Sequence, residues 1–178
     1  MKGSIEMLLS TQTEVLASLY GEEDAIRMLA EAGFDAFDLS LFSMTSDPKY
    51  PMNGPNYREF SEGLRKASER YGIVCNQAHA PFPSSHGDPE KDSHTFKSII
   101  RAMEAASIVG AKIIIVHPKC HLSYRTKAQD MMEINMEFYR SLIPYCEKIG
   151  IQVACDNMWQ YNDKAGRIID STCSRPEE

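Results

Sequence analysis

The chain has 178 residues, of which 43% are hydrophobic and 25% charged, a composition typical of a globular domain large enough to bury a core. Its formal net charge of -6 argues against a nucleic-acid partner, because nucleic-acid-binding surfaces are usually basic. No apolar run approaches the roughly 20 residues needed to cross a bilayer, so we expect no membrane partner. The N-terminal residues lack the apolar core of a signal peptide, and the 5 cysteines are widely spaced. We therefore expect a reduced, cytoplasmic protein without disulfides.

Glycines recur along the chain at a nearly constant spacing. They are Gly33, Gly72, Gly110 and Gly150, at steps of 39, 38 and 40 residues. Each follows a stretch with helical periodicity and precedes a short apolar run, the place where a helix ends in a left-handed conformation. A repeat of helix, glycine and strand predicts a series of βα units, and hence an α/β fold with a parallel sheet.

The predicted elements follow this repeat in chain order. The predicted strands span residues 7–11, 36–41, 73–79, 113–117 and 151–156. The predicted helices span residues 22–32, 57–71, 93–109 (capped by Asp92 or Ser93) and 126–149, the last kinked or divided at Pro144. Three long loops are predicted at 42–56, 80–92 and 157–173. The four β-branched residues at 113–116 are typical of a strand buried on both faces, and Pro118 sets its limit, so His117 is predicted to end that strand.

The end of the sequence also resembles an element boundary. Ser174 and Glu177 have the spacing of a capping box, which predicts the start of a helix. A full (β/α)₈ barrel takes about 250 residues, and only five strands are predicted here. We therefore expect one domain over residues 1–178, a partial TIM barrel of about five parallel strands with outer helices. It would contain four βα units, the fifth strand and the start of the fifth helix. A complete five-stranded open sheet is the alternative.

Polar residues lie at or close to the carboxyl ends of four of the predicted strands. They are Asp38, His79, His117 and Asp156. The carboxyl ends of parallel strands meet at one end of a barrel, where catalytic groups gather. Imidazole and carboxylate ligands together suit Zn²⁺, Mn²⁺, Co²⁺ or Fe²⁺. One such residue alone is more often a hydrogen-bonded core residue, but four at matching repeat positions favour a site. Trp159 is equally consistent with the floor of a sugar pocket and with packing.

These strand endings resemble those of the xylose isomerase-like TIM barrels, a superfamily of sugar-phosphate isomerases, ketose 3-epimerases, inosose dehydratases and the endonuclease IV group. The resemblance implies that Asp38 lines the substrate pocket and that His79 and His117 contact substrate or bind metal. It also implies that Asp156 is a metal ligand and an acid/base residue. Asp156 stands where the family usually has Glu, one methylene longer, and the family's remaining ligands come from later strands that are not predicted here.

The resemblance leads us to expect a metal-dependent sugar (phosphate) isomerase or epimerase that transfers a proton next to a carbonyl. The implied roles are catalytic for Asp156 and His79, substrate-binding for Asp38, His117 and Trp159, and metal-binding for Asp156, His117 and His79. The implied cofactor is a divalent metal (Mn, Zn, Co or Mg), and the implied partner is a small sugar or sugar phosphate. Two alternatives stay open: an endonuclease IV-like phosphodiesterase, against which the acidic charge counts, and a non-catalytic half barrel that self-associates through exposed strand edges.

Overall fold

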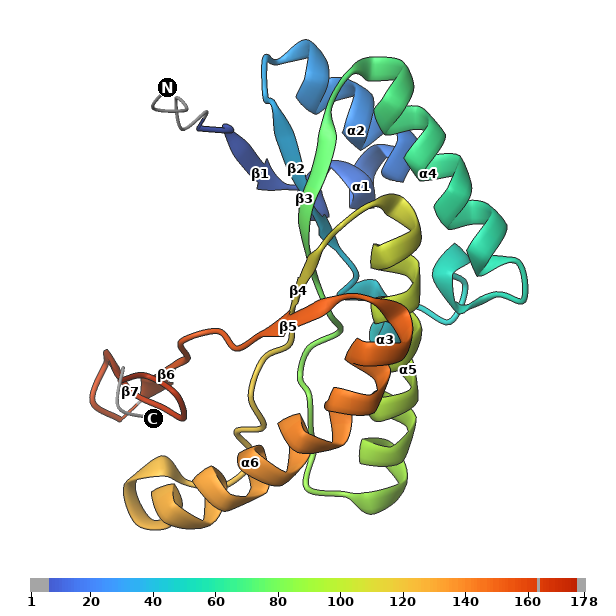
Figure 1. Cartoon of the computed structure of the whole chain (residues 1–178). Coiled ribbons are helices and arrows are strands. Elements are labelled where there is room, and N and C mark those ends of the chain that lie inside the picture. The colour runs from blue at the N-terminus through green and yellow to red at the C-terminus, as the bar shows by residue number, and fades with distance from the viewer. Residues whose placement is uncertain (1–6, 163, 176–178) are drawn as a thin grey trace, which may run out of the picture.

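The computed structural model describes residues 7–162 and 164–175 and contains the predicted parallel sheet (Figure 1). All four strand pairs in the sheet are parallel, and the strands lie in sequence order, β1-β2-β3-β4-β5. The strands are β1 (Ser10–Gln12), β2 (Ala36–Ser40), β3 (Val74–His79), β4 (Ile113–Ile115) and β5 (Gln152–Ala154). The α/β prediction is confirmed, because consecutive parallel neighbours joined by helices are the arrangement of a partial TIM barrel.

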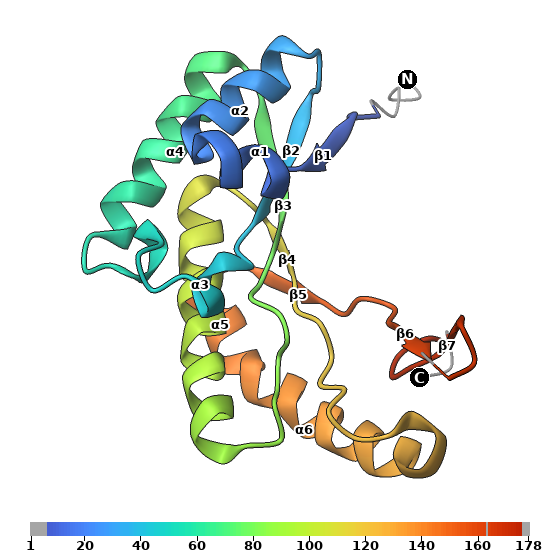
Figure 2. The ribbon, with the colours of Figure 1, turned by 180° about the vertical axis from the view of Figure 1, so that it is seen from behind.

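The helices gather on one side of the sheet, while the C-terminal segment extends on the other side (Figures 1 and 2). They are α1 (Glu14–Tyr20), α2 (Glu22–Glu31), α3 (Ser43–Ser46), the 3₁₀ helix η1 (Pro51–Asn53), α4 (Tyr57–Tyr71), α5 (Pro89–Val109) and α6 (Tyr124–Ile149). The four repeating glycines all have positive φ, as their spacing predicts. At Gly150, for example, φ is 76° and the amide donates to the Cys146 carbonyl at 2.8 Å, which closes α6.

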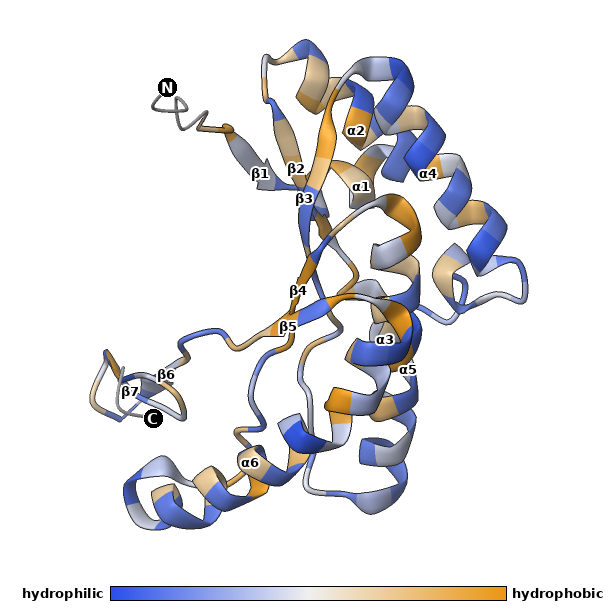
Figure 3. Cartoon of the chain, viewed as in Figure 1, coloured by the Kyte–Doolittle hydropathy of each residue, from blue (hydrophilic) through white to orange (hydrophobic). Residues whose placement is uncertain are grey.

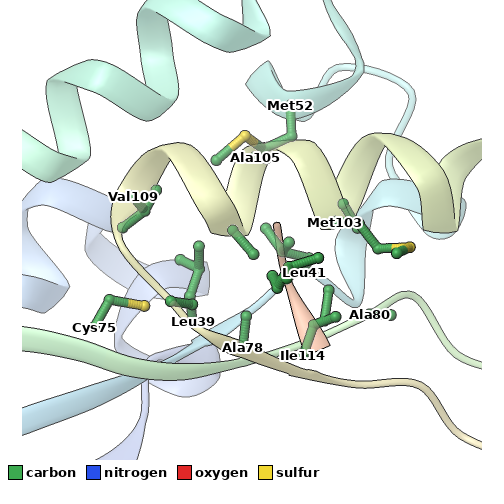
Figure 4. Packing of buried hydrophobic residues seen from close by; sticks show 14 of the residues in the cluster. Leu39, Leu41, Met52, Cys75, Ala78, Ala80, Met103, Ala105, Val109 and Ile114 are labelled. Carbon is green, nitrogen blue, oxygen red and sulfur yellow. The ribbon is translucent and has the colours of Figure 1, made fainter. Parts of the chain in front are cut away.

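The core lies between the sheet and these helices, and α5 supplies much of it (Figure 4). Leu39 of β2, Met103 of α5 and Ile114 of β4 are completely buried there. Figure 3 shows the apolar character of β4, which the run of isoleucines predicts. Because side chains alternate along a strand, burial of Leu39 against the helices directs Asp38 and Ser40 to the opposite face of β2.

A β-bulge sets the register between β2 and β3. Phe37 pairs with Cys75, but the next residue, Asp38, pairs with Gln77, so the ladder skips Asn76. In an unbroken ladder Asp38 would pair with Asn76. The bulge therefore brings Asp38 beside Gln77 and moves it closer to His79 at the end of β3, an effect that bulges often have beside functional sites.

The prediction of a loop over residues 157–173 is wrong, because this segment contains a β-hairpin. Its strands are β6 (Trp159–Asn162) and β7 (Arg167–Asp170), paired antiparallel. Aromatic and β-branched residues in both strands favour extended structure. The turn is fixed by Asn162, whose carbonyl accepts from the Gly166 amide at 2.8 Å, while Gly166 adopts a φ of 61°.

Helix boundaries required three further corrections. Helix α1 was not predicted, and α3 and η1 occupy parts of the predicted loop 42–56. Helix α5 begins at Pro89, because Asp88 caps it by accepting from the Glu90 and Lys91 amides at 3.0 Å each, in place of Asp92 or Ser93. Asp92 instead accepts from the His86 amide at 2.6 Å.

Helix α6 continues through Pro144, contrary to the predicted kink or division there. The non-helical residue is Lys127, with φ -138° and ψ 24°. The predicted helix start at 174–177 falls partly outside the described residues.

Strand limits also differ from the predictions. β1 lies at 10–12 rather than 7–11, and β5 ends at Ala154. β4 ends at Ile115, so His117 follows the strand instead of ending it. The backbone stays tied to β5 one residue longer, because the Val116 amide donates to the Ala154 carbonyl at 2.9 Å. Among the described residues, no helix has the length and apolarity needed to cross a bilayer.

Candidate metal and substrate site

Three of the four predicted strand-end residues converge at the carboxyl end of the sheet. His79 is the last residue of β3, and His117 and Asp156 follow β4 and β5. One ligand atom from each side chain lies within 4.8 Å of the other two. The two imidazole rings have centroids 5.6 Å apart. This is the juxtaposition that the repeat positions predict for neighbouring parallel strands.

Asp38 lies behind His79 rather than in this cluster. Its Oδ2 lies 2.8 Å from Nδ1 of His79 and accepts from Nε2 of Gln77 at 2.7 Å, and the Asp38 side chain is almost completely buried. A carboxylate paired with Nδ1 favours the tautomer in which Nδ1 carries the proton. Nε2 of His79 then keeps its lone pair for a ligand or a substrate.

The surroundings of His117 favour its neutral form. Burial and the neighbouring His79 lower its pKa below the ordinary value, against the opposing influence of Asp156. Its Nε2 lies 3.5 Å from Oδ2 of Asp156, while its Nδ1 is buried without a hydrogen-bond partner among the described residues. An uncharged histidine beside a carboxylate is a suitable ligand for a divalent cation.

Aromatic rings enclose the two histidines. The Phe82 ring lies 4.8 Å from the His117 ring, centroid to centroid, and Phe42 lies 5.7 Å from His79 and 6.0 Å from His117. Such apolar walls lower the local dielectric constant and strengthen interactions between charges at the cluster.

Side chains from other elements fix the segment that carries His117. Ser84 Oγ, in the loop after β3, donates to the His117 carbonyl at 2.6 Å. Tyr139 of α6 places its hydroxyl 2.7 Å from the Val116 carbonyl oxygen and 3.2 Å from Cys155 Sγ. Asn135 bonds both the amide and the carbonyl of Lys119, at 2.7 and 2.9 Å. Three side chains, one from the loop after β3 and two from α6, thereby position the segment.

The family model of the xylose isomerase-like TIM barrel matches residues 26–174, which is most of the chain and contains all the residues of this cluster. The chain belongs to the xylose isomerase-like TIM barrel family. A search of curated protein sequences finds no match.

Solved structures share the fold of this xylose isomerase-like chain. A D-tagatose 3-epimerase-like protein matches with a TM-score of 0.64 and 19% identity, over 88% of this chain and 55% of that one. The 3-keto-D-glucoside 4-epimerase YcjR from E. coli matches with a TM-score of 0.65 and 20% identity, over 89% and 59%. IolI, solved with a zinc atom, matches with a TM-score of 0.60 and 15% identity, over 84% and 51%. The xylose isomerase-like chain thus spans little more than half the length of these structures.

The donor set and its surroundings fit a divalent metal. His79, His117 and Asp156 supply two imidazole nitrogens and a carboxylate oxygen, a set that Zn²⁺, Mn²⁺ and Co²⁺ accept. The Asp38 carboxylate behind His79 completes the carboxylate–histidine arrangement common around bound metals.

The remaining predicted residue, Trp159, lies on the hairpin of this xylose isomerase-like chain and is 63% exposed. Sequence reasoning missed Gln77, Phe42 and Phe82. Gln77 carried a usable signal, because it precedes His79 by two residues and side chains two apart in a strand share a face. The two phenylalanines lie in loops, where no periodicity indicates direction.

Proposed function

We propose that this chain provides the β3–β5 side of the active site of a metal-dependent sugar isomerase or epimerase. The observation that carries the proposal is the convergence of His79, His117 and Asp156 within 4.8 Å at the carboxyl end of the sheet. Residues 1–178 would form one domain of a cytoplasmic enzyme. The epimerase names of the solved structures support the same class of reaction.

The burial and the hydrogen bonds of each residue in the cluster indicate its role. His79 and His117 are buried, and each offers a nitrogen to the cluster, so we assign both to holding the metal. His79 is fixed in this role by Asp38, which occupies its Nδ1. This replaces the catalytic role that the resemblance implied for His79 and the substrate-binding roles that it implied for His117 and Asp38.

Asp156 is the member of the set most open to substrate, with 41% of its side chain exposed. We assign to its carboxylate the removal of a proton from the carbon next to a keto group of the sugar. A bound divalent metal would supply Lewis-acid polarisation of that carbonyl. The Phe42 and Phe82 rings would exclude water from the histidine side of the site, and Trp159, on the hairpin after β5, would contact the sugar.

The first test is metal content. Elemental analysis of the purified, desalted chain should find about one equivalent of Zn, Mn or Co. The His79→Ala and His117→Ala variants should each bind much less, while His94→Ala, an exposed histidine of α5, should bind as the wild type does. Equal metal in all four proteins, or none in the wild type, would contradict the proposed site.

The second test is proton transfer. In D₂O with bound metal, D-fructose and D-tagatose should acquire deuterium next to the carbonyl, observed by NMR. Asp156→Asn keeps an oxygen for the metal but removes the base, so it should retain metal and lose exchange by about a hundredfold or more. Exchange at the wild-type rate in Asp156→Asn would exclude the base role.

A further inference from the structure

Two cysteines lie on either side of the β6–β7 hairpin, and the function proposed above uses neither. Cys155 directly follows β5 and precedes Asp156, while Cys173 lies shortly after β7, which ends at Asp170. Figures 1 and 2 show that the hairpin between them projects from the end of β5, away from the helices that cover the sheet. Both thiols are reduced in this structure.

The register of the hairpin explains why these two cysteines meet. β6 and β7 pair antiparallel with Trp159 opposite Asp170, so the segments that flank the two strands start out beside each other. Cys155 lies on the segment that enters β6, and Cys173 lies on the segment that leaves β7. Their side chains are in direct contact, because the Cys173 thiol donates a hydrogen bond to the Cys155 sulfur.

The segment that carries Cys173 is an ordered turn. Ser171 and Thr172, which precede it, are buried, and the Ser174 amide donates to the Ser171 carbonyl at 3.2 Å. Cys173 has a φ of 59° and is the one non-glycine residue with positive φ in the described part of the chain. Such a conformation persists only where the surrounding contacts hold it. The turn therefore keeps the Cys173 thiol directed at Cys155.

Cys155 lies where two parts of the metal cluster are connected. Its Sγ is 3.2 Å from the hydroxyl of Tyr139, and the same hydroxyl is 2.7 Å from the Val116 carbonyl oxygen. The hydroxyl thus connects the segment leading to His117 with the segment leading to Asp156. A change in the bonding of the Cys155 sulfur therefore affects both segments.

The surroundings of the two thiols favour redox chemistry over metal binding. Within residues 7–162 and 164–175, the side chains grouped closely enough to hold a metal ion are His79, His117 and Asp156, and neither cysteine belongs to that group. Cys155 is exposed and Cys173 is half-buried, so a small oxidant in solution reaches the Cys155 sulfur.

We propose that Cys155 and Cys173 form a redox modification site, where hydrogen peroxide converts the two thiols into a disulfide and thereby weakens metal binding at the neighbouring cluster. The effect on metal binding rests on the proposed function, whereas formation of the disulfide is independent of it. Disulfides in a reducing cytoplasm are usually transient, so thiol reductants would break this bond again.

The reaction consumes one molecule of hydrogen peroxide. The Cys155 sulfur attacks one peroxide oxygen and the O–O bond breaks; the departing hydroxide takes up the thiol proton and leaves as water, which gives a sulfenic acid at Cys155. The Cys173 sulfur then attacks the sulfenic sulfur. An S–S bond forms as the S–O bond breaks, and this hydroxide leaves as a second water with the Cys173 proton. Two electrons pass from the thiols to the peroxide.

The disulfide would change what Cys155 contacts. Its sulfur moves from hydrogen-bond contact to a covalent bond length of about 2 Å from the Cys173 sulfur, and so gives up the Tyr139 hydroxyl. The adjacent Asp156 backbone moves with it. Loss of a contact behind a metal ligand typically lowers metal affinity by about ten- to a hundredfold, so we expect the oxidised chain to bind zinc at least about tenfold more weakly.

Peptide mapping of the full chain tests the disulfide. Trypsin places the two cysteines in different peptides, residues 149–164 and 168–178. After treatment with a small excess of hydrogen peroxide, mass spectrometry without reduction should find these peptides joined. Alkylation should count two fewer thiols than the 5 of the reduced chain, and dithiothreitol should restore them. Absence of this crosslink, or a preferred crosslink to another cysteine, would overturn the proposal.

Variants assign the roles of the two sulfurs. Cys155→Ser and Cys173→Ser should each lose the crosslink, and Cys173→Ser should accumulate a Cys155 sulfenic acid that dimedone labels, because no resolving thiol is left beside it. Cys146→Ser, which removes a thiol of α6, should form the crosslink to the wild-type extent. Equal unfolding temperatures of the reduced proteins would establish that all are folded. Equal dimedone labelling of the wild type and Cys173→Ser would overturn the role of Cys173.

Zinc titrations of the reduced and the oxidised chain separate this proposal from the proposed function. The oxidised wild type should bind zinc at least about tenfold more weakly than the reduced wild type, and dithiothreitol followed by desalting should restore the affinity. No zinc binding by the reduced chain would contradict the proposed metal site and leave the disulfide standing. Equal zinc affinity before and after crosslinking would overturn the effect of the disulfide on the cluster.

Discussion

Asp38 and His79 lie on adjacent strands with Oδ2 of the carboxylate 2.8 Å from Nδ1 of the imidazole. Gln77 donates to the same carboxylate oxygen at 2.7 Å, so the buried carboxylate is held on two sides. The pair is positioned by the β-bulge that places Asp38 opposite Gln77. The orientation of a candidate ligand thus depends on a residue that lies outside the cluster itself.

Replacement of Asp38 by Asn should weaken metal binding by about ten- to a hundredfold, the usual cost of losing such a partner. The amide is uncharged and has one acceptor oxygen in place of two, so it holds the proton on Nδ1 of His79 less strongly. Zinc titration of Asp38→Asn beside Asp24→Asn, an exposed carboxylate of α2, measures the effect. Unchanged affinity in Asp38→Asn would show that the His79 tautomer is set by something else.

Metal should also stabilise the folded chain. At a zinc concentration 100 times the dissociation constant, the free energy of unfolding should rise by about 2.7 kcal/mol. Chelation should reverse the rise, and His117→Ala should remove it, whereas His86→Ala in the exposed loop after β3 should keep it. Urea unfolding with and without zinc measures each difference. A rise of the same size in His117→Ala would mean that zinc binds somewhere else.

Tyr139→Phe should destabilise the chain by about 1–2 kcal/mol, because the Val116 carbonyl loses its hydroxyl partner at 2.7 Å. Val116 directly precedes His117, so zinc affinity should fall as well. Tyr145→Phe is the matched control on the same helix, since the Tyr145 hydroxyl has no hydrogen bond within the described residues. Equal losses in the two variants would show that the hydrogen bond to the Val116 carbonyl is not the cause, because only Tyr139 makes that bond.

Glu22 should make stability depend on pH. Burial raises its pKa to about 7, and the hydrogen bond from Tyr50 only partly opposes this. The folded chain therefore binds a proton that the unfolded chain releases near pH 4.5, so this group's contribution to stability falls as pH rises from about 4.5 to about 7 and is constant above.

Glu22→Gln resembles the protonated side chain at every pH. Its free energy of unfolding should be close to that of the wild type near pH 5. At pH 8 it should exceed the wild-type value by up to about 3 kcal/mol, since one pKa unit corresponds to about 1.36 kcal/mol. Glu23→Gln, an exposed neighbour paired with Arg70, should show no such gain. Urea unfolding at both pH values decides the matter, and a gain of equal size at pH 5 and pH 8 would rule out titration of Glu22 as the cause.

The repeating pattern made much of the fold predictable. Gly72 marks the end of α4, predicted with the bounds it has, because a helical stripe and a left-handed cap are both local signals. The convergence of His79, His117 and Asp156 follows from strand order, which is also a consequence of the repeat.

The features that escaped prediction depend on contacts between distant residues. The place of Asp38 behind His79 depends on a bulge in the ladder, and nothing in the sequence of β2 alone specifies it. The cap of α5 by Asp88 could be chosen over Asp92 only from the backbone geometry of the loop. The hairpin was predicted as a loop because it contains many polar residues. Trp159 and Tyr161 nevertheless alternate with polar residues, a pattern typical of a half-buried strand.

The bond from Ser84 to the His117 carbonyl has a consequence for how this part of the protein opens. It joins the loop after β3 to the chain leaving β4, so neither can detach without breaking the same buried contact. Amide protons of the two segments should therefore exchange with solvent in one cooperative event, and faster together once Ser84 is replaced by Ala. His79 and His117, which are far apart in the sequence, would then keep or lose their positions together.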